Sequence, residues 1–173
     1  MAGSSSRSSK PRPPAGPRLR SLKSADKGPI EKILRATGAF TEDEVGVALE
    51  LVDEGLAPGG GGYRFLVAEG AAGEVEGYSC FGDTPLTEGT YDLYWIAVAP
   101  SAQGRGIGRT LMRASEGAVR KAGGRMLLIE TASKPSYDAT RAFYASVGYR
   151  EVARIPDFYR PGDDKIVYAL RLS

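Results

Sequence analysis

One segment of the chain, residues 91–122, leaves few folds open, because it joins a strand-like run to a helix through a cluster of glycines. The run Y-D-L-Y-W-I-A-V at 91–98 is apolar and rich enough in strand-forming residues for a central strand. Apolar side chains then recur at helical spacing, which predicts a helix over about 104–122: Ile107, Leu111, Ala114 and Ala118. A strand, a glycine turn and a helix in this order are typical of layered α/β folds.

The rest of the chain predicts further strands and helices in a definite order. An edge strand within 18–23 precedes a short helix that begins at Pro29 and ends at Gly38, and Thr41 with Glu44 forms a capping box for a second helix. The remaining expected elements are a hairpin of 63–69 and 74–81, a strand at 126–130, a helix at 135–147 and strands at 149–155 and 165–171. This order predicts an α/β fold with a mixed, mostly antiparallel central sheet and helices on both faces, in one domain over 18–173.

The composition excludes several kinds of chemistry. The 173 residues contain no histidine, which removes Ser-His-Asp and Cys-His catalysis and every histidine-based metal site, so we expect no metal. Cys80, the single cysteine, cannot form an internal disulfide, and without a histidine to activate it we expect a small buried packing residue. No stretch approaches the roughly 20 apolar residues of a membrane span, so we expect no membrane contact.

Basic residues are concentrated at the start of the chain. Residues 1–25 hold six basic and no acidic side chains; removing those six from the 23 basic residues leaves 17 against 21 acidic ones. Residues 1–17 are mostly Ser, Pro, Gly, Ala and base, which predicts a disordered tail. The tail has no apolar core of a secretory signal, so we expect a cytoplasmic protein. Without interleaved aromatic residues, we prefer a solvated extension to a nucleic-acid-binding arm, and a transit peptide remains an open alternative.

The glycine cluster itself, Q-G-R-G-I-G at 103–108, predicts a site for an anionic group. Three glycines let backbone N–H groups converge at the start of a helix, where the helix dipole is positive. The segment is not a P-loop, because no Gly stands at 103 and no Lys at 109. The dinucleotide pattern G-x-G-x-x-G also fails, since Arg109 stands where the third glycine should be. A structural turn with no ligand is the alternative.

Several segments together resemble the GNAT superfamily of acetyltransferases. Q-x-x-G-x-G at 103–108 is similar to the pyrophosphate-binding signature of that family, and W-I-A-V at 95–98 is similar to its splayed central strand. The segment A-T-R-A-F-Y-A-S-V-G-Y at 139–149 looks like the helix that ends in F-Y-x-x-x-G-F/Y, and the last two strands resemble the terminal hairpin. The resemblance covers about 18–172 and implies an acyl-CoA N-acyltransferase-like fold with acetyl-CoA as acyl donor.

The resemblance also implies which residues hold the donor. The central strand would pair with the pantetheine arm and the loop would hold the diphosphate, giving a binding set of Ile96, Ala97, Val98, Gln103, Gly104, Arg105, Gly106, Ile107, Gly108 and Arg109. Many relatives carry an asparagine that contacts the cofactor about seven residues before the catalytic tyrosine. Tyr137 stands there in this chain, which departs from the pattern, and we expect it to belong to the donor-binding set as the eleventh residue.

Acyl transfer to an amine needs a base for the amine and an acid for the departing thiolate. By resemblance Tyr144 is the general acid, and packing in the core is its alternative role, with the adjacent Phe143 pointing elsewhere. Glu130 resembles the glutamate used by ribosomal-protein N-terminal acetyltransferases, and Asp92 matches the glutamate of histone-type members. Glu130 is the preferred candidate base and Asp92 the second, and a solvated acid at the sheet edge is the alternative for each.

Two aromatic residues complete the candidate site. Phe158 and Tyr159, in the expected loop between the last two strands, resemble aromatics that line the acceptor pocket of N-terminal acetyltransferases, or they cover the end of the sheet. The sequence therefore predicts an N-acetyltransferase acting on a primary amine by direct attack in a ternary complex. The acidic body mildly favours a cationic amine. A non-catalytic acetyl-CoA-binding sensor or interaction module is the alternative, and exposed sheet edges permit a homodimer.

Overall fold

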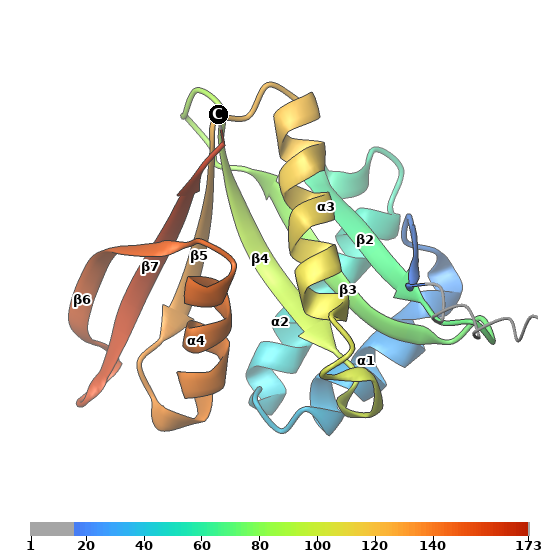
Figure 1. Cartoon of the computed structure of the whole chain (residues 1–173), viewed down its shortest axis with the longest axis horizontal. Helices are drawn as coiled ribbons and strands as arrows, with labels where there is room; N and C mark the ends of the chain where they lie inside the picture. Colours follow the sequence, from blue (N-terminus) through green and yellow to red (C-terminus); the bar gives the residue numbers. More distant parts are fainter. Residues whose placement is uncertain (1–15, 173) are drawn as a thin grey trace, which may run out of the picture.

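Seven strands form one sheet in the computed structural model, which describes residues 16–172 (Figure 1). The expected tail of residues 1–17 lies outside the described residues except for its last two positions. The strands are β1 (Arg18–Arg20), β2 (Tyr63–Glu69), β3 (Val75–Asp83), β4 (Thr90–Val98), β5 (Met126–Ala132), β6 (Arg150–Arg160) and β7 (Asp163–Arg171). Among residues 16–172 no helix is long and apolar enough to cross a membrane.

The strand order β1-β2-β3-β4-β5-β7-β6 confirms the predicted mixed and mostly antiparallel sheet. Strands β1 to β4 pair in sequence as an antiparallel meander. The pair β4–β5 is parallel, because α3 connects the two strands as a crossover. Strand β7 then inserts antiparallel between β5 and β6, which leaves β6 at one edge of the sheet and β1 at the other.

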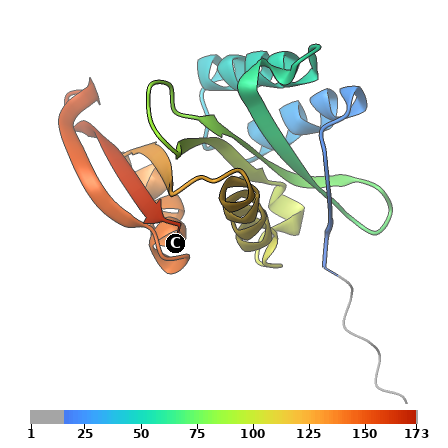
Figure 2. The ribbon, with the colours of Figure 1, turned by 90° about the horizontal axis from the view of Figure 1, so that it is seen from above.

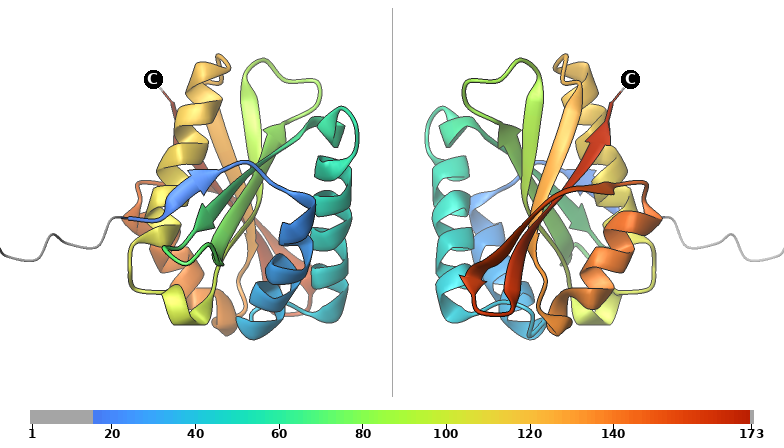
Figure 3. Two further views of the ribbon diagram at one scale, coloured as in Figure 1. Left: turned by 90° about the vertical axis from the view of Figure 1, so that its right-hand side faces the viewer. Right: turned by 90° about the vertical axis from the view of Figure 1, so that its left-hand side faces the viewer.

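The helices cover both faces of the sheet, as predicted. Figures 2 and 3 show α1 (Lys27–Ala36) and α2 (Glu42–Leu56) on one face, and α3 (Ile107–Lys121) and α4 (Asp138–Ser146) on the other. The capping box is confirmed, since the Thr41 hydroxyl accepts from the Glu44 N–H at 3.2 Å and the Thr41 N–H donates to the Glu44 carboxylate at 2.7 Å. Cys80 is fully buried under α1 and α2, and burial raises the pKa of its thiol, as expected for a packing residue.

Several boundaries differ from the prediction by a few residues, and two of the differences have identifiable reasons. Helix α3 begins at Ile107 rather than near 104, because Gly104 and Gly106 adopt positive φ values of 75° and 81°. The expected loop at Phe158 and Tyr159 is wrong, since both residues belong to β6.

A bulge explains the second difference. Asp157 has a φ of 54°, and the β6–β7 register shifts between Ile155 and Arg160 before Arg160 pairs with Asp163. The bulge is held by side chains, because the Asp157 N–H donates to Asp164 Oδ1 at 3.1 Å and the Gly162 N–H donates to Asp157 Oδ1 at 2.6 Å. Pro156 and this bulge interrupt the sequence pattern of a strand without ending the strand.

Candidate active site

The site begins where β4 and β5 separate. Their parallel pairing runs from Thr90 and Met126 only as far as Leu93 and Ile129. Tyr94 is an extra residue in β4, because neighbouring residues of β3 pair with Leu93 and with Trp95. Beyond this bulge β4 stays bonded to β3 while β5 stays bonded to β7, so the two strands diverge. Beyond Leu93 the backbone of β4 therefore has no strand partner on the β5 side.

The glycine loop brings backbone N–H groups to the same place. A short 3₁₀ turn (Pro100–Ala102) follows β4, and the left-handed Gly104 and Gly106 then redirect the chain into α3. The first N–H groups of an α-helix have no acceptor inside the helix, and Thr110 is where bonding to Gly106 begins, at 3.0 Å. The free N–H groups and the positive end of the helix dipole thus face one region, which is suited to an anionic oxygen.

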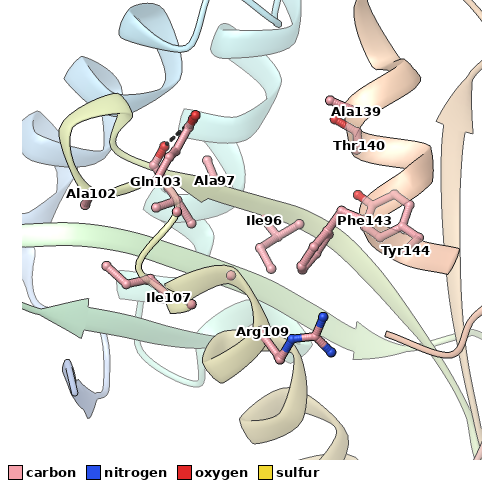
Figure 4. A pocket seen from close by; sticks show the side chains of 14 residues that line it. Ile96, Ala97, Ala102, Gln103, Ile107, Arg109, Ala139, Thr140, Phe143 and Tyr144 are labelled. Atoms are coloured by element: carbon pink, nitrogen blue, oxygen red, sulfur yellow. Dashed lines mark hydrogen bonds between the residues drawn. The ribbon is translucent and has the colours of Figure 1, made fainter. Parts of the chain in front are cut away.

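A cleft of about 450 Å³ lies between this loop, β4 and α4 (Figure 4). Nine of the eleven residues predicted to bind the donor line it: Ile96, Ala97, Val98, Gln103, Gly104, Gly106, Ile107, Gly108 and Arg109. The Gln103 side-chain amide donates to the Val98 carbonyl at 3.3 Å, which ties the loop to the end of β4. The sequence prediction and the shape of the molecule therefore select nearly the same surface.

Arg105 and Tyr137 lie outside that lining. The Arg105 guanidinium turns away and pairs with the carboxylate of Glu76. Tyr137 packs against Phe40 with ring centroids 6.5 Å apart, and its hydroxyl donates to Glu44 Oε1 at 3.4 Å. Burial is the main reason that the pKa of the Tyr137 hydroxyl is raised, and the charge of Glu44 adds to it.

Helix α4 supplies the opposite wall with residues that the sequence analysis missed. Ala139, Thr140 and Phe143 line the cleft beside Tyr144 (Figure 4). The prediction that Phe143 points elsewhere is therefore wrong, because its side chain lines the cleft. Their spacing of three and four residues is the signal that could have found them, because such positions share one helix face.

Gly108 is what allows the two walls to approach. A Cβ on Gly108 would lie 3.3 Å from Phe143 Cζ and 3.8 Å from a methyl group of Val98. That first contact is tighter than ordinary side-chain packing, so only glycine leaves the start of α3 and the ring of Phe143 at their present separation.

Tyr144 is a cleft residue and a core residue at once. Its ring packs 5.8 Å from that of Tyr168 and 6.5 Å from that of Tyr149, and the residue is only 6 % exposed. Burial raises the pKa of its hydroxyl well above the usual value for tyrosine. The hydroxyl consequently keeps its proton at neutral pH and is able to act as a proton donor.

The two candidate bases lie on the sheet face opposite α3 and α4. Asp92 is paired with Leu128 across β4 and β5, and Glu130 lies two residues further along β5, so both side chains share that face. Neither carboxylate lines the cleft. The structure thus brings Asp92 and Glu130 near each other beside the point where the strands diverge, but on the far side from the glycine loop.

These two carboxylates have different surroundings. Burial raises the pKa of Asp92, and the negative charge of Glu130 adds to the increase, while a hydrogen bond from the Thr84 hydroxyl at 2.7 Å acts in the opposite sense. Glu130 is half-exposed and pairs with Lys165, whose Nζ lies 2.5 Å from Glu130 Oε2. The same Nζ lies 4.9 Å from the centre of the Phe158 ring.

Phe158 and Tyr159 form an exposed aromatic pair on this second face. Their rings meet edge to face with centroids 4.9 Å apart, and each residue is about half exposed, at 51 % and 50 %. Through Lys165 the pair is continuous with Glu130, so β6, β7 and β5 present aromatic and charged groups together.

Comparisons with known proteins agree with this geometry. Residues 61–151 match the family model of the acetyltransferase (GNAT) domain. The chain is 36 % identical over 101 residues to the N-alpha-acetyltransferase RimI of Mycobacterium tuberculosis. The aligned residues make up 57 % of this chain and 60 % of that relative's length.

Solved structures match over a larger share of the chain. A protein from Desulfovibrio desulfuricans that is assigned to the GNAT family of acetyltransferases is 44 % identical, with a TM-score of 0.85 over 90 % of this chain and 99 % of that one. The Salmonella typhimurium protein yncA, solved with its cofactor acetyl-CoA, shares the fold at 23 % identity, with a TM-score of 0.71 over 92 % and 95 % of the two chains. The chain described here belongs to the GNAT family of acetyltransferases.

Proposed function

We propose that the chain transfers an acetyl group from acetyl-CoA to a primary amine by direct attack of the amine within a ternary complex. The observation that carries the proposal is the cleft at the divergence of β4 and β5, with unbonded N–H groups of α3 at one end and the Tyr144 hydroxyl on its wall. The name of the RimI relative and the acetyl-CoA in the yncA structure support the same donor and reaction class. Bound acetyl-CoA would supply the activated thioester.

The start of α3 would hold the diphosphate of the donor. The backbone N–H groups of Ile107, Gly108 and Arg109 would donate hydrogen bonds to anionic oxygens, so no buried cationic side chain is needed, and the helix dipole adds to the attraction. The Arg109 side chain, which is exposed and contacts Ser146 at 3.4 Å, contributes positive charge at the rim. The backbone of β4 beyond Leu93, which has no strand partner on the β5 side, would pair with the amide-containing arm of the donor.

Tyr144 would donate a proton to the sulfur as the thiolate leaves. The raised pKa of its hydroxyl, caused by burial, keeps the proton in place until that moment. Direct transfer also suits the rest of the site, because Cys80 is buried away from the cleft and its thiol has a raised pKa, so it is no activated nucleophile.

Asp92 is the stronger candidate for the base, and Glu130 the second. An alkylammonium must lose a proton before it attacks, and a carboxylate with a raised pKa accepts protons more readily near neutral pH. Glu130 is already bound to Lys165, which competes with an incoming amine. The amine would approach from the face that carries Phe158 and Tyr159, so donor and acceptor would meet from opposite sides of the sheet.

The first test is donor binding by isothermal titration calorimetry, with a pair of matched glycine variants. Gly108→Leu places a side chain against Phe143 and into the cleft, whereas Gly117→Leu adds the same side chain to the same helix where a Cβ has nothing within 4 Å. We expect acetyl-CoA to bind the wild-type and Gly117→Leu proteins and not Gly108→Leu. Equal binding by all three would place the donor elsewhere, and no binding by the folded wild-type protein would refute the proposal.

The second test is turnover, measured as thiol release with a panel of primary amines. Loss of turnover in Asp92→Asn with acetyl-CoA binding retained would support the enzyme and the assignment of the base. Binding of acetyl-CoA without turnover of any amine would favour a non-catalytic acyl-CoA-binding module instead.

A further inference from the structure

Arg105 stands in the middle of the glycine loop, yet its side chain faces away from the cleft. Its Nη1 donates to Oε1 of Glu76, the second residue of β3. The Glu76 side chain is only 5 % exposed, whereas that of Arg105 is 55 % exposed. The arginine therefore reaches back from the loop to a carboxylate buried at the end of a neighbouring strand.

Glu76 also holds the loop through its backbone. The Ala99 N–H, at the start of the loop, donates to the Glu76 carbonyl at 2.8 Å. One residue of β3 thus fixes the segment at its entry, through Ala99, and at its middle, through Arg105. Between these points Gly104 lacks a Cβ and adopts positive φ, so the intervening backbone has little intrinsic stiffness.

The environment of Glu76 makes this ion pair different from an ordinary surface pair. Its second oxygen, Oε2, is buried and has no hydrogen-bond partner among residues 16–172. Arg105 is accordingly the group that compensates this buried charge, and its loss would leave an anion uncompensated beside the start of α3. An uncompensated anion there opposes the binding of a diphosphate.

We infer that Glu76 is a positioning residue, which acts through Arg105 to hold the glycine loop in the shape that binds the donor diphosphate. This inference rests on the proposed function. It assigns Arg105 a role as an anchor of the loop, in place of the direct phosphate contact that the sequence predicts. The backbone N–H groups and Arg109 then remain as the phosphate-binding groups.

The test compares four variants by calorimetry with CoA. Glu76→Gln, Arg105→Met and the double variant remove the pair, and Arg113→Met removes a basic side chain from the exposed face of α3 as a matched control for net charge. We expect Kd for CoA to rise at least about tenfold in each single variant and no further in the double variant, because both changes break the same anchor. Arg113→Met should bind like wild type.

Kinetics separate positioning from a general structural defect. With acetyl-CoA we expect KM to rise in Glu76→Gln while kcat at saturating donor stays unchanged. With S-acetylpantetheine, which lacks the diphosphate, wild type and variant should have the same kcat/KM. Glu76→Asp, which keeps the charge and shortens the reach, should weaken CoA binding in the same way and serves if Glu76→Gln does not fold.

If Arg105 instead contacts the phosphate directly, the opposite effects on CoA binding are expected. Glu76→Gln and Glu76→Asp would then bind CoA as tightly as wild type or more tightly, and Arg105→Met alone would weaken binding; this result overturns the inference. Unchanged Kd in all variants overturns it as well. If wild type itself fails to bind CoA, the proposed function falls and the inference falls with it, which is a different result from wild-type binding that the variants share.

Discussion

Replacing Tyr144 by phenylalanine tests the proposed chemistry with very little structural change. The ring stays packed against Tyr168 and Phe143, each with a centroid 5.8 Å away, so no cavity forms. Tyr144 lines the cleft, so removal of its hydroxyl leaves the packing of its ring in place. We therefore expect the free energy of unfolding to change by less than about 1 kcal/mol.

The expected catalytic effect is much larger. A positioned general acid contributes roughly 10²–10⁴-fold, so kcat of Tyr144→Phe should fall at least about 100-fold, which is about 2.7 kcal/mol in activation free energy. Because the lost interaction arises as the thiolate departs, Kd for acetyl-CoA should change less than about threefold. The measurements are thiol release under saturating donor and calorimetric binding on the same preparation.

A second tyrosine provides the control. Tyr168→Phe removes a hydroxyl from a neighbouring ring of the same core, on a residue that does not line the cleft. It should keep wild-type kcat. The reasoning is refuted if Tyr144→Phe binds acetyl-CoA and turns over like wild type, or if both variants lose activity equally. Since burial raises the pKa of Tyr144, wild-type kcat should also show no alkaline decline from this group below the usual tyrosine range.

Two further predictions concern ionisation. If Asp92 is the base, kcat/KM should fall as the pH drops through its raised pKa. Thr84→Val removes the hydrogen bond that lowers this pKa and should move the acidic limb of the pH profile to higher pH, whereas Glu130→Gln removes a negative charge and should move that limb to lower pH. Abolished activity in Glu130→Gln would instead make Glu130 the base. Burial opposes ionisation of Asp26, but two hydrogen bonds from Arg20, at 2.7 and 2.9 Å, help to lower its pKa below the usual value. The stability that Asp26 contributes is thus present above its unfolded-state pKa of about 4 and is lost as the pH falls through its folded-state pKa. In urea titrations at pH 7, Arg20→Met should lower the free energy of unfolding by about 3 kcal/mol. An equal loss at pH 3 would contradict this linkage.

The sequence was sufficient to predict most of the fold because its signals are local. The capping box at Thr41, the glycines that end α3 and the two strand-like runs of the 63–81 hairpin each determine a neighbouring element. Strand β6 was harder to predict, because the Asp157 bulge depends on Asp164 seven residues away. A side-chain contact of this kind leaves no periodic signal, and the proline before it resembles a strand end.

In the candidate site, too, features set by local sequence could be predicted, and features set by contacts between distant segments could not. The lining residues from Ile96 to Arg109 follow from a motif that is continuous in sequence. The spacing of residues on α4 indicates which of them share a helix face, but not that this face forms a wall of the cleft. The turn of Arg105 toward Glu76 and the pairing of Glu130 with Lys165 are contacts between distant segments, and composition and spacing say nothing about them. The residues that take part in the site could largely be inferred from the sequence, but the directions of their side chains depend on the order of strands in the sheet.

On the proposed function, the divergence of β4 from β5 explains how one sheet would serve two substrates. In a continuous sheet the cleft on the α3 and α4 face would be sealed from Asp92 and Glu130 on the other face, because backbone hydrogen bonds close the space between strands. Here pairing stops at Leu93, and the bulge at Tyr94 directs the rest of β4 away. A donor bound on one face and an amine on the other can therefore meet at the gap, each with its own protein groups for the proton that moves. The interruption of pairing, which costs the sheet several hydrogen bonds, is on this proposal the feature that makes transfer across it feasible.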